Sequence, residues 1–140
     1  MKILLPVDGS ECTTRMLNHL ATHPDLLAGD HHYTLFTVIE PSTPRVSGPF
    51  DCGSLEEILG ERAKQVLQPA VAFAQQQHWK FDTDFVPGSP VQAIVDKAES
   101  LKPDLILMGT HGRSPFGTFV LGSVANGVLN NCKVPLLLIR

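Results

Sequence analysis

The stretch Leu105–Ser123, LILMGTHGRSPFGTFVLGS, joins a short apolar run to a glycine-bearing segment. Leu105 to Met108 are four consecutive apolar residues, which predicts a buried strand of a parallel sheet. Gly109 and Gly112 follow that run. Glycine lacks a Cβ, so the chain can turn sharply there and its backbone can approach a ligand closely.

The same stretch ends where a helix is expected to begin. Gly122-Ser123 precedes an apolar pattern of helical period, formed by Val124, Ala125, Val128 and Leu129. The first turn of a helix presents N–H groups without intrahelical partners and the positive end of the helix dipole. Together with the Ser123 hydroxyl, these groups predict a binding site for an anion such as a phosphate.

Strand and helix patterns alternate along the rest of the chain. Apolar or β-branched runs predict five strands, the third of them half-exposed and at a sheet edge, over residues 3–5, 33–39, 81–85, 105–108 and 134–139. Amphipathic patterns of helical period predict about four helices between them. This alternation predicts a single α/β domain over residues 1–140, built on one doubly wound, open parallel sheet.

Local signals predict how the helices begin and where one is disturbed. Ser10 is expected to cap the first helix, and capping-box patterns occur at Ser54 to Glu57 and at Ser89 to Gln92. Pro69 lies inside the second helical pattern, where it removes a hydrogen-bond donor. A kink or a restart of the helix is therefore expected at that position.

Composition excludes several classes of protein. A net charge of -3 gives no electrostatic reason to expect a nucleic-acid partner. Three widely spaced cysteines, Cys12, Cys52 and Cys132, fit neither a disulfide framework nor a zinc site. The chain has no apolar run long enough to span a membrane, and its first residues do not resemble a signal peptide. We therefore expect a cytoplasmic protein.

Asp8 follows the first predicted strand, at the sheet edge where open α/β proteins bind ligands. A carboxylate there can accept hydrogen bonds from sugar hydroxyls or an exocyclic amine, or it can simply cap the next turn. The segment 40–53 is rich in proline and glycine and leaves the same edge. It is expected to be either a lid or a plain mobile loop.

The spacing Gly109-x2-Gly112-x9-Gly122-Ser123 resembles the ATP-binding signature of the universal stress protein family. Ile3 to Ser10 and Val134 to Arg140 are also typical of that family, so the resemblance covers the whole chain. It implies the strand order 3-2-1-4-5, with a fold that is Rossmann-like or similar to the adenine nucleotide alpha hydrolases. It also implies a role in the stress response, ATP as ligand with or without Mg²⁺, and a homodimer.

The resemblance assigns binding roles residue by residue. Residues that match the family's adenine and ribose contacts are Pro6, Val7, Asp8 and Val38; those that match its ribose and phosphate contacts are Met108, Gly109, Gly112, Gly122, Ser123, Val124 and Ala125. The family often has a hydroxyl residue where this chain has Ala125, so that position offers only its backbone. His111 and Arg113 lie in the same loop, and Arg113 is expected either to fold onto terminal phosphates or to be an exposed basic residue. The other histidines, His31-His32 among them, lack metal-ligand spacing.

The chemistry of the predicted site favours binding over turnover. The chain has no Gly-x4-Gly-Lys-[Ser/Thr] loop and no general base beside Ser123, so no catalytic residue is assigned. A nucleotide-binding regulatory protein with at most slow hydrolysis is the leading hypothesis. The alternatives are a true ATPase or nucleotidyl transferase that uses Asp8, and an interaction module that binds no nucleotide.

The C-terminal run Val134 to Ile139 predicts a self-association surface. An apolar strand at an uncovered sheet edge tends to aggregate unless another strand pairs with it. A two-fold copy of the same strand is the usual solution, and it agrees with the family's dimers. The downstream protein partner has no signal in the sequence.

Overall fold

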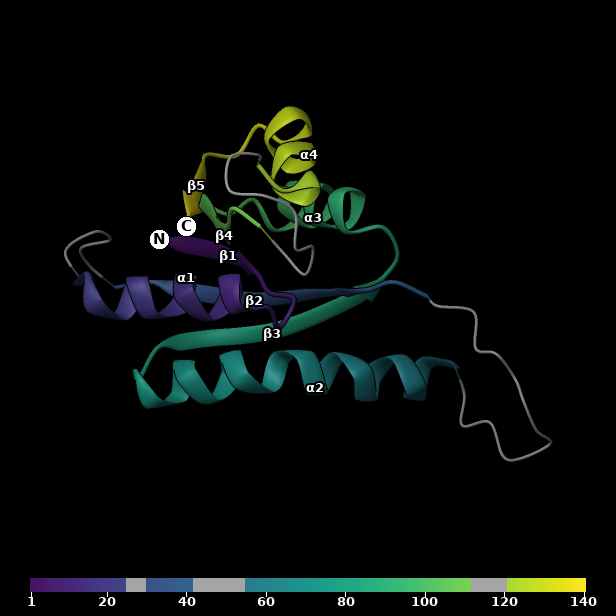
Figure 1. Cartoon of the computed structure of the whole chain (residues 1–140), viewed down its shortest axis with the longest axis horizontal. Helices are drawn as coiled ribbons and strands as arrows, with labels where there is room; N and C mark the ends of the chain where they lie inside the picture. Colours follow the sequence, from purple (N-terminus) through teal and green to yellow (C-terminus); the bar gives the residue numbers. More distant parts are fainter. Residues whose placement is uncertain (25–29, 42–54, 112–120) are drawn as a thin grey trace.

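The computed structural model describes residues 1–24, 30–41, 55–111 and 121–140. Five strands and four helices alternate along these residues (Figure 1). Their bounds are β1 Lys2–Pro6, α1 Glu11–Thr22, β2 His32–Ile39, α2 Leu55–Gln76, β3 Lys80–Pro87, α3 Pro90–Leu101, β4 Leu105–Gly109, α4 Ser123–Asn131 and β5 Leu136–Ile139. The predicted strands are therefore confirmed, although β5 begins two residues later than the apolar run that predicted it. The segment 40–53 lies almost wholly outside the described residues.

The five strands form one parallel sheet in the order β3-β2-β1-β4-β5. This confirms both the doubly wound α/β class and the strand order that the family resemblance implied. β3 is an edge strand, as its half-exposed pattern predicted, and β5 is the other edge. In the region described, no helix is long and apolar enough to cross a membrane.

Helices cover both faces of the sheet, and each face has its own hydrophobic core (Figure 1). One core joins the sheet to α1 and α2, and its buried members include Ile3, Leu5, Met16, Leu67 and Leu107. The second joins the sheet to α3 and α4, and its buried members include Leu4, Phe36, Ile94, Ile106 and Val128. Alternate residues of β1 therefore enter different cores. This explains why the strand is apolar at consecutive positions.

The helix starts agree only in part with the capping predictions. The Ser10 side chain accepts a hydrogen bond from the Thr13 N–H, so the first predicted cap is confirmed. Ser89 occupies the N-cap of α3 but makes no side-chain capping bond. The Gln92 side-chain amide donates instead to Asp96 Oδ1 at 2.7 Å, one turn further along the helix. The capping box at Ser89 is therefore wrong, because the Gln92 side chain bonds to the Asp96 carboxylate on its own helix. The box at Ser54 lies outside the described residues.

Pro69 does not interrupt α2, which runs from Leu55 to Gln76 as a single helix (Figure 1). The predicted restart is therefore wrong. Pro69 removes the donor for the carbonyl of Gln65, but both residues are exposed, so water can satisfy that carbonyl. Buried Leu67, Ala70 and Ala74 continue the packing face across this position.

Tyr33 and Trp79 form a stacked pair at the start of β2 and β3, with ring centroids 4.5 Å apart. Phe73 of α2 meets Trp79 edge to face, with centroids 5.7 Å apart. Tyr33 is 7% exposed. Burial raises the pKa of the Tyr33 phenol above its ordinary value, because the phenolate loses solvation.

We expect the Tyr33 phenol to titrate above pH 10, the ordinary value for tyrosine, in the folded protein. The raised pKa means that the folded state holds its proton longer than the unfolded state. The free energy of unfolding should therefore fall as the pH rises from about 10 through the folded-state pKa. The chain has one tyrosine, so the near-ultraviolet absorbance of phenolate reports on this group alone. Equal midpoints with and without urea would contradict the expectation.

Candidate functional site

The neighbours of β1 place the candidate site at a topological switch point. Ile3 pairs with Leu105 and Leu4 with Ile106, so β1 and β4 lie side by side and parallel. The chain leaves β1 toward β2 on one side, whereas β4 is followed by β5 on the other side. In open α/β sheets, ligands bind in the crevice outside the carboxyl ends of the two strands at this point. The turn after β1 and the segment after β4 both begin at that edge.

Asp8 lies in the turn between β1 and α1, half-buried. Its Oδ1 accepts hydrogen bonds from the Ser10 N–H at 3.0 Å and from the Thr13 hydroxyl at 2.8 Å. The Asp8 N–H lies 3.3 Å from the same hydroxyl oxygen. The turn-capping interpretation of Asp8 is therefore correct for Oδ1, and these bonds fix the carboxylate at the sheet edge.

The start of α4 presents the donors expected of an anion site. Gly122 is the N-cap, and its N–H donates to the Thr110 carbonyl at 2.8 Å. The first bond of the helical ladder runs from the Asn126 N–H to the Gly122 carbonyl at 2.9 Å. The N–H groups of Ser123 to Ala125 precede that bond, so helix geometry leaves them outside the ladder. They are also at the positive end of the helix dipole.

The glycines of this region serve close packing within the protein. A Cβ at Gly109 would lie 3.0 Å from the Cys12 Cβ and 3.3 Å from the Cys12 carbonyl oxygen. A Cβ at Gly122 would lie 2.8 Å from the Thr110 carbonyl oxygen, inside van der Waals distance. The interpretation of Gly109 as a point of ligand approach is therefore incomplete, because α1 already occupies the space beside it.

The remaining predicted site residues have different surroundings. Met108 is buried against α3 and α4, and the Val7 N–H donates to the Phe36 carbonyl. The Ala125 methyl group is also buried in that core, so only its backbone can meet a ligand. Four further members of the predicted set are half-buried: Pro6, Val38, His111 and Val124. Gly112 and Arg113 lie outside the described residues.

Sequence reasoning missed Thr110, which is bonded to the end of β5, to the N-cap of α4 and to His111. This residue is 8% exposed and follows β4 directly. Its N–H donates to the Ile139 carbonyl at 2.9 Å, and its own carbonyl accepts from Gly122. Its hydroxyl lies 3.0 Å from His111 Nδ1. The signal available in the sequence was a single small polar residue directly after an apolar strand.

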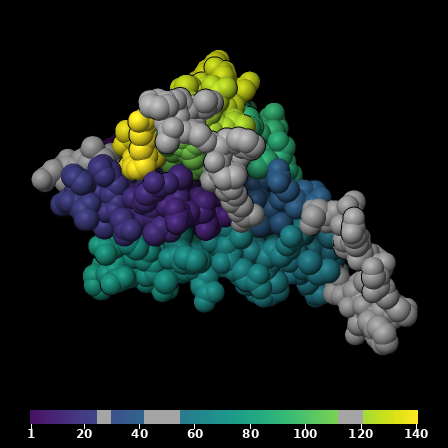
Figure 2. Space-filling model, in the orientation of Figure 1, coloured from purple at the N-terminus to yellow at the C-terminus, as the bar shows by residue number. Residues whose placement is uncertain are grey.

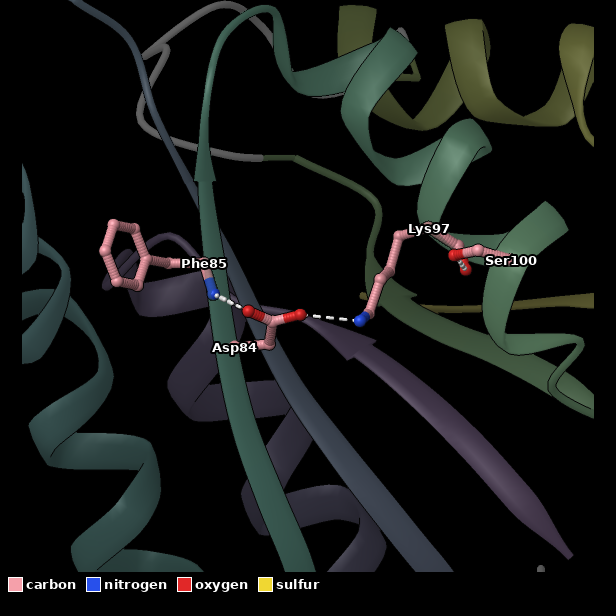
Figure 3. A network of polar contacts seen from close by, with 4 residues as sticks. All are labelled: Asp84, Phe85, Lys97 and Ser100. Atoms are coloured by element: carbon pink, nitrogen blue, oxygen red, sulfur yellow. Dashed lines mark hydrogen bonds and ion pairs between the residues drawn. The ribbon is translucent and has the colours of Figure 1, made fainter.

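A second missed contact lies on the other side of β2, between β3 and α3. Figure 3 shows the Lys97 side chain extending from α3 to Asp84 on β3, with Nζ and Oδ2 2.5 Å apart. The ammonium also lies 5.9 Å from the centre of the Phe36 ring. Asp84 Oδ1 accepts from the Phe85 N–H at 2.8 Å, so both carboxylate oxygens have partners. This ion pair connects α3 to the edge strand β3.

Two of the hollows among the described residues include no predicted site residue. One, of about 570 Å³, lies between β3 and α3 beside the Asp84–Lys97 pair. The other, of about 470 Å³, lies at the amino edge of the sheet among Lys2, Asp30, Lys80, Lys102 and other polar residues. Within the same part of the chain, no group of three histidine, cysteine or acidic residues is arranged to hold a metal ion.

The strand order and the helices on both faces of the sheet define a doubly wound α/β protein with a Rossmann-like fold. The chain belongs to the universal stress protein family, a family of stress-response proteins, because the family model matches residues 1–140. Universal stress protein MJ0531 of Methanocaldococcus jannaschii is 31% identical over 99% of this chain and 81% of its own length. A universal stress protein of Thermus aquaticus is 34% identical over 99% of this chain and 97% of its own.

Solved structures agree with the fold. The structure of the protein MJ0577 superposes with a TM-score of 0.73 at 26% identity, over 99% of this chain and 94% of that one. A universal stress protein in complex with cAMP gives a TM-score of 0.69 at 20% identity, over 100% and 96% of the two chains. A family member from Arabidopsis thaliana with AMP bound gives 0.68 at 15% identity, over 99% and 90%. At these last two identities, the likeness shows the fold alone.

Proposed function

We propose that this chain binds an adenine nucleotide at the carboxyl edge of β1 and β4. The observation that carries the proposal is the position of Asp8 and the α4 N-terminus at the same topological switch point. Two proteins of the same fold, with bound cAMP and AMP, support the ligand class. In this proposal, nucleotide occupancy alters a partner interaction, and hydrolysis is slow at most.

The described residues suit a phosphate group at one end of the crevice. The N–H groups of Ser123 to Ala125 lie outside the helical ladder, and Ser123 is exposed. In the proposal these residues hold the phosphates of ATP, with or without Mg²⁺, while Asp8 faces the ribose or adenine. Arg113 and Gly112 complete the proposed phosphate contacts.

Calorimetric titration with AMP, ADP, ATP and cAMP tests this proposal, each with and without Mg²⁺. We expect one equivalent of an adenine nucleotide to bind and the matching guanine nucleotide to bind more weakly. No heat of binding with any of the four ligands, in protein purified through denaturation and refolding, would support an interaction module with an empty crevice.

The replacement Asp8→Asn tests the role of the carboxylate. The asparagine side chain keeps an oxygen that can accept from Ser10 and Thr13, so the turn should survive and the free energy of unfolding should change by less than about 0.5 kcal/mol. The charge is lost, so nucleotide affinity should fall by about tenfold, the value of one hydrogen bond to a charged group. Unchanged affinity would show that Asp8 serves the turn alone.

The same variant separates binding from catalysis. Asp8 Oδ1 is held by two donors of its own turn, which favours a positioning role over that of a mobile base. We expect wild-type protein with ATP and Mg²⁺ to release phosphate at less than one turnover per minute. Faster turnover that Asp8→Asn abolishes would favour the ATPase or nucleotidyl transferase hypothesis.

The two edges of the sheet differ in how they resist pairing, which supports self-association through β5. β3 carries Asp82 and Asp84 and ends at Pro87, and charges and proline discourage edge-to-edge pairing. β5 carries only apolar residues, and Leu136 to Leu138 are half-exposed. Figure 2 shows β5, in yellow, at the surface of the molecule. The proposal includes a homodimer through Val134 to Ile139.

Lysine at Leu136 and Leu138 should convert the dimer into a monomer, because two like charges would meet across the pairing edges. Light scattering after size-exclusion chromatography measures the mass. The matched control is Leu129→Lys on α4, where the side chain is 52% exposed. A dimer that survives the double replacement would contradict this interface.

The cytoplasm is the proposed compartment. Cys12 and Cys132 are free thiols, as a reducing compartment would keep them, and Cys52 lies outside the described residues.

A further inference from the structure

Thr110 is bonded through its backbone to two elements that are distant in sequence. On one side its N–H donates to the carbonyl of Ile139, at the end of β5, at 2.9 Å. On the other side its carbonyl accepts from the N–H of Gly122, the N-cap of α4, at 2.8 Å. Thr110 therefore links the end of β5 directly to the N-cap of α4, where the phosphate is proposed to bind.

The β5 end of this connection is the most buried residue of the strand. Leu136 to Leu138 are half-exposed, whereas Ile139 is 7% exposed and belongs to the core that β1 shares with α1 and α2. Ile139 is also the register partner of Gly109, the residue before Thr110. Packing of the Ile139 side chain thus helps to position the carbonyl that accepts the Thr110 N–H.

The α4 end of the connection has no free space. A Cβ at Gly122 would lie 2.8 Å from the Thr110 carbonyl oxygen and 3.2 Å from the His111 Cα. The Gly122 backbone is therefore in contact with the backbone of both residues. A shift of Thr110 must displace the N-cap of α4, because close-packed backbone cannot absorb the movement.

We infer that the end of β5 positions the N-terminus of α4 through Thr110. Pairing of another strand with β5 and binding of the nucleotide are therefore thermodynamically linked. The inference rests on the proposed nucleotide site. A strand that pairs with the outer edge of β5 holds Ile139 in place and thereby strengthens nucleotide binding at Ser123 to Ala125. By linkage, bound nucleotide strengthens that pairing by the same factor.

Two core truncations of equal size test this inference in the full chain. Ile139→Ala truncates the most buried side chain of β5. Leu20→Ala, at 6% exposure, removes as many atoms from the same core near the C-terminal end of α1. Amide hydrogen exchange of Gly122 without ligand and calorimetric titration with AMP are measured for both variants and for the wild type.

We expect Ile139→Ala to accelerate exchange of the Gly122 amide and to weaken AMP binding, each by about fivefold to tenfold relative to Leu20→Ala. Saturating AMP should also slow exchange of the Thr110 amide in the wild type. Equal behaviour of the two variants would overturn the inference. If Ile139→Ala does not fold, Ile139→Val should shift both quantities in the same direction by a smaller factor, and no shift there would overturn it.

AMP binding and amide exchange of Gly122 test different claims. Absence of AMP binding in the wild type would contradict the proposed function, whereas the ligand-free exchange of Gly122 still decides whether β5 positions α4.

Discussion

Gly122→Ala should lower the affinity for AMP by about a hundredfold. The added Cβ would lie 2.8 Å from the Thr110 carbonyl oxygen, which is backbone and cannot rotate away. The N-cap must therefore move, and the N–H groups of Ser123 to Ala125 no longer point toward the proposed phosphate position. Two lost hydrogen bonds to a charged group, at about 1.5 kcal/mol each, correspond to about a hundredfold in affinity.

Gly60→Ala is the matched control, and calorimetric titration of both variants with AMP is the measurement. A Cβ at Gly60 would meet only the end of the Phe85 ring at 3.9 Å, an ordinary contact. Gly60 lies inside α2, so alanine there should raise the free energy of unfolding by about 0.5 to 1 kcal/mol and leave AMP binding unchanged. Wild-type affinity in Gly122→Ala would show that the start of α4 is not the phosphate site.

Leu107→Ala should reduce the free energy of unfolding by about 2 to 5 kcal/mol. Leu107 is 0% exposed and lies in β4, with β1 on one side and β5 on the other. The closely packed sheet around it cannot collapse into the space that the side chain leaves, so the loss includes a cavity cost. Urea denaturation monitored through Trp79 fluorescence measures the change.

Leu129→Ala makes the same chemical change at a side chain that is 52% exposed. We expect it to alter the free energy of unfolding by less than about 0.5 kcal/mol. Equal costs for the two leucines would contradict the assignment of β4 to the interior of the sheet.

The sequence was sufficient for the class of fold because its strands are covered on both faces. Runs such as Ile3 to Leu5 and Leu105 to Met108 are apolar at every position, and helical patterns separate them. The strand order needed the family resemblance, because alternation alone does not say which strands are neighbours. The edge position of β3 did follow from its own pattern, in which Asp82 and Asp84 alternate with apolar residues.

The two local predictions that were wrong concern the capping box at Gln92 and the effect of Pro69 on α2. Gln92 was expected to complete a capping box, but Asp96 on the same helix face provides a charged acceptor. Pro69 was expected to kink or restart the helix, but α2 continues through it, because buried neighbours extend the packing face and the exposure of Gln65 makes the missing bond tolerable. Local propensity could not decide either case, because both outcomes depend on surroundings that the fold creates.

Within the candidate site, the sequence located the ends of the strands but not the bonds between them. Asp8 and Gly122-Ser123 could be found from their positions after strands or before helices. Thr110 and the Asp84–Lys97 pair could not, because their partners become neighbours only when the sheet assembles. Gly109 was identified as important, although its contact with Cys12 requires the position of α1.

An NMR titration of the labelled protein with AMP tests the proposed nucleotide site most directly. We expect the amide resonances of Asp8 and of Ser123 to Ala125 to shift together and saturate with one affinity. The amides of Lys2, Lys80 and Lys102, which line the hollow at the opposite edge of the sheet, should not shift. Shifts confined to these lysines, or no shift at the start of α4, would contradict the account.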